Sequence, residues 1–116
     1  EQKVVQDLLN SADVIFCTLS TTGSLPIRRM EPVSDLIVDE ASASTEPELM
    51  IPLHTKPDKL LLVGDPRQLP ATVQSPLATQ FGLGQSLQER LMFDSKFDYT
   101  LLDVQYRMRP EISEWP

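Results

Sequence analysis

Two short apolar runs constrain the fold of this chain more than any other feature. Residues 36–38 and 60–63 are entirely aliphatic. They lack the alternation of apolar and polar side chains that marks a strand with one face in water. Strands of this kind are covered on both faces, as in parallel sheets flanked by helices. The sequence therefore predicts an α/β fold with a parallel sheet.

The segments around these runs fit the same architecture. Apolar spacing and turn residues predict, in chain order, a helix at 2–11, strands at 14–18 and 36–39, a helix from 46 to about 53, a strand at 59–63, a helix capped by Ser86, a strand at 99–104 and a short helix from Pro110. Residues 21–34 lack periodicity and are predicted to be loop. We expect the first three strands to form a parallel core, because right-handed helical crossovers join neighbours in that order.

Charge and composition limit the possible functions. A net charge of -7 argues against binding nucleic acid by bulk electrostatics, so any such contact must be local. No apolar run is long enough to span a membrane, and the first residues do not resemble a signal peptide, so we expect an intracellular protein. The single Cys17, inside an apolar run, is predicted to be buried and without a chemical role.

Two carboxylates follow the first aliphatic run. The carboxyl ends of parallel strands gather at one edge of a sheet, where ligands bind. Asp39 and Glu40 lie at such an end and suit a magnesium-nucleotide site, where one carboxylate holds the metal through its water shell and the other takes a proton from water. The alternative is structural, since acidic residues at this place also favour the dipole of a following helix.

Polar groups also follow two later strands. Gln68 offers a donor and an acceptor in a proline-rich loop and is suited to sensing a phosphate, although Asp65 capping a plain turn explains the loop equally well. After the last predicted strand, Arg107 can place a planar cation against a phosphoryl group, and Tyr106 offers a face for a base. The alternative for Arg107 is a surface residue on the approach to a helix.

Other catalytic chemistries have too few residues. His54 is the only histidine, and its place in a proline-flanked loop predicts an exposed polar residue. One cysteine and one histidine are too few ligands for a Cys/His metal site.

Several motifs together resemble those of a known family. They are DEAS at 39–42, VGDPRQLPATV at 63–73, QSLQERL at 85–91 and LLDVQYRMRPEIS at 101–113. In this order they resemble motifs II, III and IV of superfamily 1 helicases, specifically the senataxin and nonsense-mediated-decay helicase group. ADVIFCTLSTTGS at 12–24 is similar to motif Ic of that group. The resemblance covers nearly the whole chain and implies a RecA-like P-loop NTPase sheet, with ATP and Mg²⁺ as cofactors, in the nucleus or cytoplasm.

The resemblance also implies roles for individual residues. Asp39 would bind Mg²⁺, Glu40 would be the catalytic base, and Gln68 would contact the γ-phosphate and couple it to strand movement. Tyr106 would pack near the adenine, and Arg107 would contact the γ-phosphate as an arginine finger. The residues implied to face the sugar-phosphate backbone of a single strand of RNA or DNA are Thr18, Ser20, Pro70, Thr72 and Val73.

The chain departs from the group in three places. Gln88 stands where an aromatic residue is usual and Arg109 where histidine is common, and we expect neither to touch the chemistry. The phosphate-binding pattern G-x-x-x-x-G-K-[ST] does not occur, since no glycine is directly followed by a lysine. We therefore expect residues 1–116 to be the later part of the first motor domain, running up to the start of the second, with the P-loop strand missing and no activity of its own.

Three classes of function stay open on the sequence alone. The first is an ATP-driven helicase or translocase on single-stranded RNA or DNA, of which this chain is a part. The second is a P-loop ATPase that uses the same residues without unwinding. The third is a non-catalytic, truncated interaction module.

Overall fold

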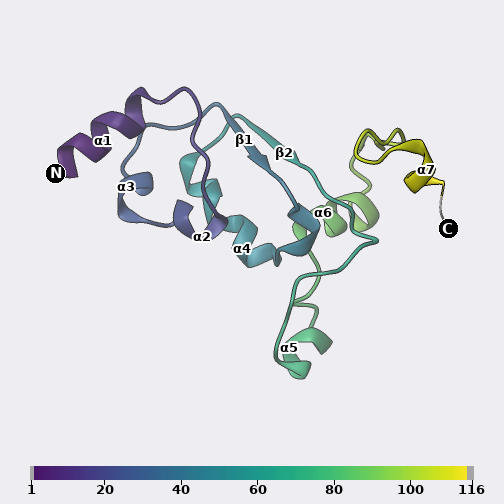
Figure 1. Cartoon of the computed structure of the whole chain (residues 1–116). Helices are drawn as coiled ribbons and strands as arrows, with labels where there is room; N and C mark the ends of the chain where they lie inside the picture. The colour runs from purple at the N-terminus through teal and green to yellow at the C-terminus, as the bar shows by residue number, and fades with distance from the viewer. Residues whose placement is uncertain (1, 115–116) are drawn as a thin grey trace.

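A two-stranded parallel sheet lies at the centre of the computed structural model, which describes residues 2–114 (Figure 1). Strand β1 (Asp35–Val38) pairs with β2 (Lys59–Leu62), so that Asp35 lies opposite Lys59 and Val38 opposite Leu62. The ladder continues one residue beyond β2, because Val63 N donates to Val38 O at 2.8 Å. The predicted parallel sheet is confirmed for these two segments, each strand ending one residue earlier than expected.

Short helices surround the sheet. They are α1 (Gln2–Ser11), α2 (Leu19–Thr22), α3 (Leu25–Arg28), η1 (Ala41–Ala43), α4 (Glu46–Met50), η2 (Pro52–Thr55), α5 (Pro76–Gln80), α6 (Leu87–Glu89), η3 (Arg90–Asp94) and α7 (Pro110–Ser113). In Figure 1, α5 projects away from the sheet, and α7 lies at the far end of the chain from α1. No helix within residues 2–114 is long and apolar enough to cross a membrane.

The core is small and lies between β1, η1, α4 and α6. Its buried members are Val38, Ala41, Leu49 and Leu87. An ion pair ties the helices over it, since Arg90 Nε and Nη2 each donate to a carboxylate oxygen of Glu46 at 2.7 Å. These hydrogen bonds lower the pKa of Glu46, so its carboxylate keeps its charge to a lower pH than a free glutamate does.

The structure corrects the predicted strand at 14–18. This segment forms no strand, and the expected three-stranded core is a two-stranded sheet. Phe16 is 93% exposed and Cys17 is exposed too, so the predicted burial of Cys17 is wrong. Apolar β-formers make a strand only when a neighbouring strand pairs with them, and neither β1 nor β2 does so here.

The predicted strand at 99–104 is also wrong. Its residues form neither strand nor helix, and Leu102 is 83% exposed. Two other elements differ from expectation. The helix from Glu46 ends at Met50, because Pro52 has no N–H to continue the helical ladder, and the chain goes on as η2. The predicted loop at 21–34 contains α3 and the end of α2.

The molecule exposes far more surface than a compact domain of its size. Its radius of gyration is 17.3 Å, whereas 116 residues in a compact domain give about 13 Å. Its accessible surface is 9675 Å², against roughly 6,400 Å² for a folded monomer of this mass. Leu61 on β2 and the apolar side chains of 99–104 are among the uncovered groups. The sheet and the last segment thus lack the cover that their sequences call for.

Amide hydrogen exchange of the 116-residue chain tests this description. Within residues 2–114, no backbone hydrogen bond holds the amides of 99–104, whereas the Val63 amide is bonded to Val38. We expect the amides of 99–104 to exchange at close to the rate of an unfolded chain and the Val63 amide to exchange more slowly. Slow exchange across 99–104 in a monomeric sample would contradict the unpaired arrangement.

Candidate functional site

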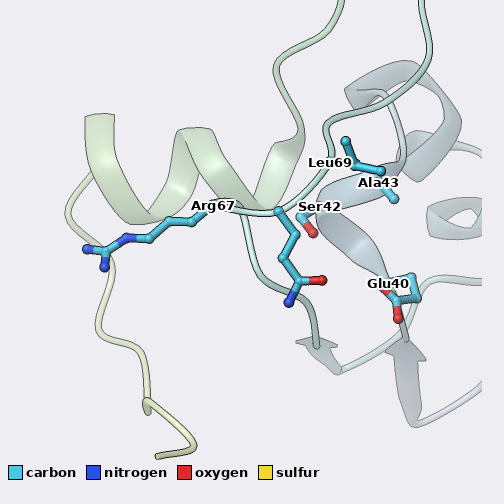
Figure 2. A pocket seen from close by; sticks show the side chains of 6 residues that line it. Glu40, Ser42, Ala43, Arg67 and Leu69 are labelled. Atoms are coloured by element: carbon cyan, nitrogen blue, oxygen red, sulfur yellow. The ribbon is translucent and has the colours of Figure 1, made fainter. Parts of the chain in front are cut away.

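The carboxyl ends of β1 and β2 open onto one pocket. It has a volume of about 550 Å³ and is lined by Glu40, Ser42, Ala43, Arg67, Gln68 and Leu69 (Figure 2). Glu40 comes from the end of β1 and Gln68 from the loop after β2, in two separate motifs of the sequence. The parallel register that sets Val38 opposite Leu62 brings these two loops together.

A tight turn positions the two carboxylates after β1. Glu40 has φ 53° and ψ 35°, the left-handed region that side chains other than glycine adopt at a cost of about 1–2 kcal/mol. Asp39 Oδ1 accepts a hydrogen bond from Glu40 N at 3.0 Å, and Ala41 N donates to Val63 O at 2.8 Å. Both carboxylates are exposed on this turn. Backbone strain of this kind is common at functional sites.

A second turn orients Gln68. Asp65 Oδ1 accepts from Arg67 N and Asp65 Oδ2 accepts from Gln68 Nε2, each at 3.0 Å. The Arg67 backbone bond, followed by the Gln68 side-chain bond, holds the pKa of Asp65 below its ordinary value. Asp65 therefore caps the turn and also fixes the amide of Gln68, whose Oε1 is still available as an acceptor. Figure 2 shows the Arg67 side chain directed away from Glu40.

Three groups crowd around Gly64, the first residue of this loop. A Cβ at Gly64 would lie 2.6 Å from Gln88 Oε1 and 3.0 Å from both N and Oγ of Ser42. Gln88 Nε2 donates to Gly64 O at 3.1 Å. Close packing of the two loops thus requires glycine at position 64.

Gln88 does not line the pocket, but its contact with Gly64 places it next to a loop that does. Gln88 is only 7% exposed and lies directly behind the loop that carries Gln68. Helical spacing contains a signal for this placement. Leu87 and Leu91 both pack in the core, and a residue three before Leu91 lies on the same side of a helix.

Tyr106 and Arg107 do not reach the pocket in this chain. Both lie in the exposed segment before α7, and Tyr106 is 92% exposed. A local loop encloses them, because Gln105 Nε2 donates to Met108 O at 3.0 Å and Met108 N donates to Gln105 Oε1 at 2.8 Å.

The predicted nucleic-acid residues lie in two places. Thr18 Oγ1 caps α2 by accepting from Thr21 N at 3.2 Å, and Ser20 is exposed on the same short helix. Pro70 and Val73 line a second pocket, and Thr72 between them is exposed.

The only histidine has a structural partner. His54 is half-buried on η2, not exposed as predicted, and its Nε2 lies 2.7 Å from Thr22 O on α2. This contact ties the helix that follows Thr18 to the helices after β1.

The carboxylates after β1 suit Mg²⁺ that is already bound to a nucleotide. Among residues 2–114, no three or more His, Cys, Asp or Glu side chains gather around one point. Mg²⁺ keeps several waters and commonly binds proteins through one or two carboxylates together with phosphates. A single exposed carboxylate such as Asp39 therefore fits nucleotide-bound Mg²⁺ and does not form an independent metal site.

Comparison with known proteins identifies the family. A family model described as "AAA domain" matches residues 1–76. The chain belongs to this AAA domain family. The match includes β1, β2 and every residue that lines the pocket, so the candidate site lies inside the AAA domain.

The relatives of this chain include proteins named as helicases. It is 43% identical over 110 residues to "Probable helicase MAGATAMA 3" of Arabidopsis thaliana, covering 94% of the chain and 13% of that protein. It is 40% identical over 116 residues to Helicase sen1 of Schizosaccharomyces pombe, covering 99% and 7%. It is 43% identical over 109 residues to the Regulator of nonsense transcripts 1 homolog of Drosophila melanogaster, covering 94% and 9%. The resemblance to the senataxin and nonsense-mediated-decay group is thereby confirmed, and the chain spans about a tenth of these relatives.

Substituting Gly64 tests the close approach at the pocket. In Gly64→Ala the new methyl group would meet Gln88 and the Ser42 backbone, so we expect the free energy of unfolding to fall by about 1–3 kcal/mol. Gly84→Ala is the matched control, because a Cβ there meets only Val73 Cγ2 at 3.9 Å. Urea unfolding of both variants measures the difference. Equal stability of the two variants would show that the loops do not pack as described.

Proposed function

We propose that this chain is part of an ATP-dependent helicase or translocase that couples Mg-ATP hydrolysis to movement on single-stranded RNA or DNA. The observation that carries the proposal is the shared pocket of Glu40 and Gln68 at the ends of paired parallel strands. The similarity to helicases supports the class of activity. The uncovered sheet supports the assignment of residues 1–116 to the later part of a first RecA-like motor domain, which we expect to be inactive alone.

The two strand-end turns would divide the work of hydrolysis. Asp39 would hold nucleotide-bound Mg²⁺ through its water shell. Glu40, on its strained turn at the edge of the pocket, would accept a proton from the attacking water. Gln68, oriented by Asp65, would contact the γ-phosphate and couple its presence to movement along the strand of nucleic acid. Bound Mg-ATP would supply the phosphoryl group that is transferred to water.

The last segment would complete the site from outside the pocket. Arg107 would place its guanidinium against the γ-phosphate, and Tyr106 would pack near the adenine. Since neither side chain lines the pocket here, these roles require residues outside this chain to hold the segment in place.

The nucleic acid would run along sugar-phosphate contacts from two motifs. Thr18 and Ser20 at α2 and the residues Pro70, Thr72 and Val73 are the proposed contacts. Thr18 and Ser20 place hydroxyl groups at the start of α2, and the other three residues lie in a loop. Because the net charge of -7 disfavours binding by bulk electrostatics, such local contacts are the kind this chain can make. Contacts of this kind follow the backbone and accept RNA or DNA.

A second candidate rests on the uncovered apolar surface. The chain would serve as a non-catalytic interaction module in which this surface binds a partner. A P-loop ATPase without unwinding would use the same pocket as the helicase. Stimulation of ATP hydrolysis by single-stranded nucleic acid separates the helicase from both alternatives.

Substitution of Glu40 in the full-length protein tests the proposed catalysis. Glu40→Gln keeps the shape of the turn and removes the base, so hydrolysis should fall at least about a hundredfold while ATP binding changes little. Glu31→Gln, in the exposed segment before β1, is the control and should keep normal turnover. Steady-state turnover and nucleotide affinity are the measurements. Normal turnover in Glu40→Gln would remove Glu40 from this role.

A further inference from the structure

Gln88 carries a buried amide that lies behind the candidate site. Its Nε2 donates to Gly64 O at 3.1 Å, across 24 positions of sequence. Its Oε1 is buried and, among residues 2–114, has no hydrogen-bond partner. A buried acceptor without a partner is unfavourable for folding, so an apolar side chain of similar size would suit this position better if packing were its only role.

The helix that carries Gln88 is fixed on both sides of it. Ser86 is 1% exposed and its Oγ accepts from Glu89 N at 3.1 Å, while Leu87 belongs to the core. Two residues after Gln88, Arg90 forms the two-pronged ion pair with Glu46 of α4. Few rotamers are therefore open to the Gln88 amide, which is aimed at Gly64 by rigid surroundings.

The same amide lies between both strand-end loops. Gln88 Oε1 and the N and Oγ atoms of Ser42 surround the same point beside Gly64, where a Cβ would be placed. Ser42 lines the pocket together with Glu40, and Gly64 begins the loop that ends at Gln68. Within that loop, Gln68 N donates to Asp65 O at 3.0 Å. A shift of Gly64 would therefore move Gln68 as well.

We infer that Gln88 is a positioning residue for ATP hydrolysis, which holds the loop of Gln68 against the turn of Glu40 through its bond to the Gly64 carbonyl. This inference rests on the proposed function. Gln88 does not touch the pocket and acts only through Gly64. Loss of its donor would let the loop shift without removing any group that contacts the nucleotide. The effect should therefore fall on turnover more than on the affinity for ATP.

Two substitutions that remove the donor test the inference in the full-length protein. Gln88→Met keeps the length of the side chain, and Gln88→Leu fills the site with a different shape. For each, kcat per folded molecule should fall about ten- to a hundredfold, with the KM for ATP within about threefold of wild type. Gln80→Met, on the exposed side of α5, is the control and should match wild type.

Hydrogen exchange without nucleotide gives a second readout on the same variants. Residues 64–69 should exchange faster in Gln88→Met and Gln88→Leu than in wild type or in Gln80→Met. Normal kcat per folded molecule in either Gln88 variant, even with reduced stability, would show that Gln88 only packs and would overturn the inference.

Failure of the proposed function has a different signature. If wild-type protein hydrolyses no ATP, the catalytic part of the inference falls with the proposed function. Exchange at 64–69 then decides whether Gln88 positions the loop, and unchanged exchange would overturn that part as well.

Discussion

The parallel pairing of β1 with β2 is the constraint on which the rest of the molecule depends. With Val38 opposite Leu62, both chains leave the sheet at the same edge, and the ladder continues through Val63 N to Val38 O. A shift of one residue would turn the side chains of one strand to the opposite face and separate the two polar loops. The register therefore fixes the core and the pocket of Glu40 and Gln68 together.

Close approach of the two loops follows from that register and sets demands on nearby residues. Position 64 must be glycine, because Ser42 and Gln88 occupy the space of a side chain. Glu40 adopts a left-handed conformation so that the chain can turn into η1 and bring Ala41 N to Val63 O. The buried side chains of Ala41 and Leu87 stabilise this junction. The Glu46–Arg90 ion pair adds a link between α4 and η3. The strained turn and the buried amide are thus parts of one arrangement.

The sequence predicted the parts of the molecule that depend on local pattern. The helix at 2–11, the two aliphatic strands and the Ser86 cap are all present, because periodicity and cap chemistry act over a few residues. The strands expected at 14–18 and 99–104 are absent, since a strand also needs a neighbour and the described chain provides none. Glu40 and Gln68 could be placed at one edge from the parallel fold alone. The contact of Gln88 with Gly64 could not be predicted, because it joins residues 24 positions apart, although the helical position of Gln88 beside Leu87 and Leu91 is a signal of its burial.

Binding of Mn²⁺ with ATP to the full-length protein tests the central claim most directly, because Mn²⁺ can replace Mg²⁺ and is counted by electron paramagnetic resonance. Asp35 begins β1 beside Lys59 on the surface, whereas Asp39 directly follows the other end of β1, next to the pocket residue Glu40. Asp39→Asn should weaken nucleotide-dependent Mn²⁺ binding about tenfold or more, as expected for a group that holds the metal through water. Asp35→Asn should leave this binding unchanged. Equal Mn²⁺ affinity in the two variants would contradict a magnesium-nucleotide site at the carboxyl ends of β1 and β2.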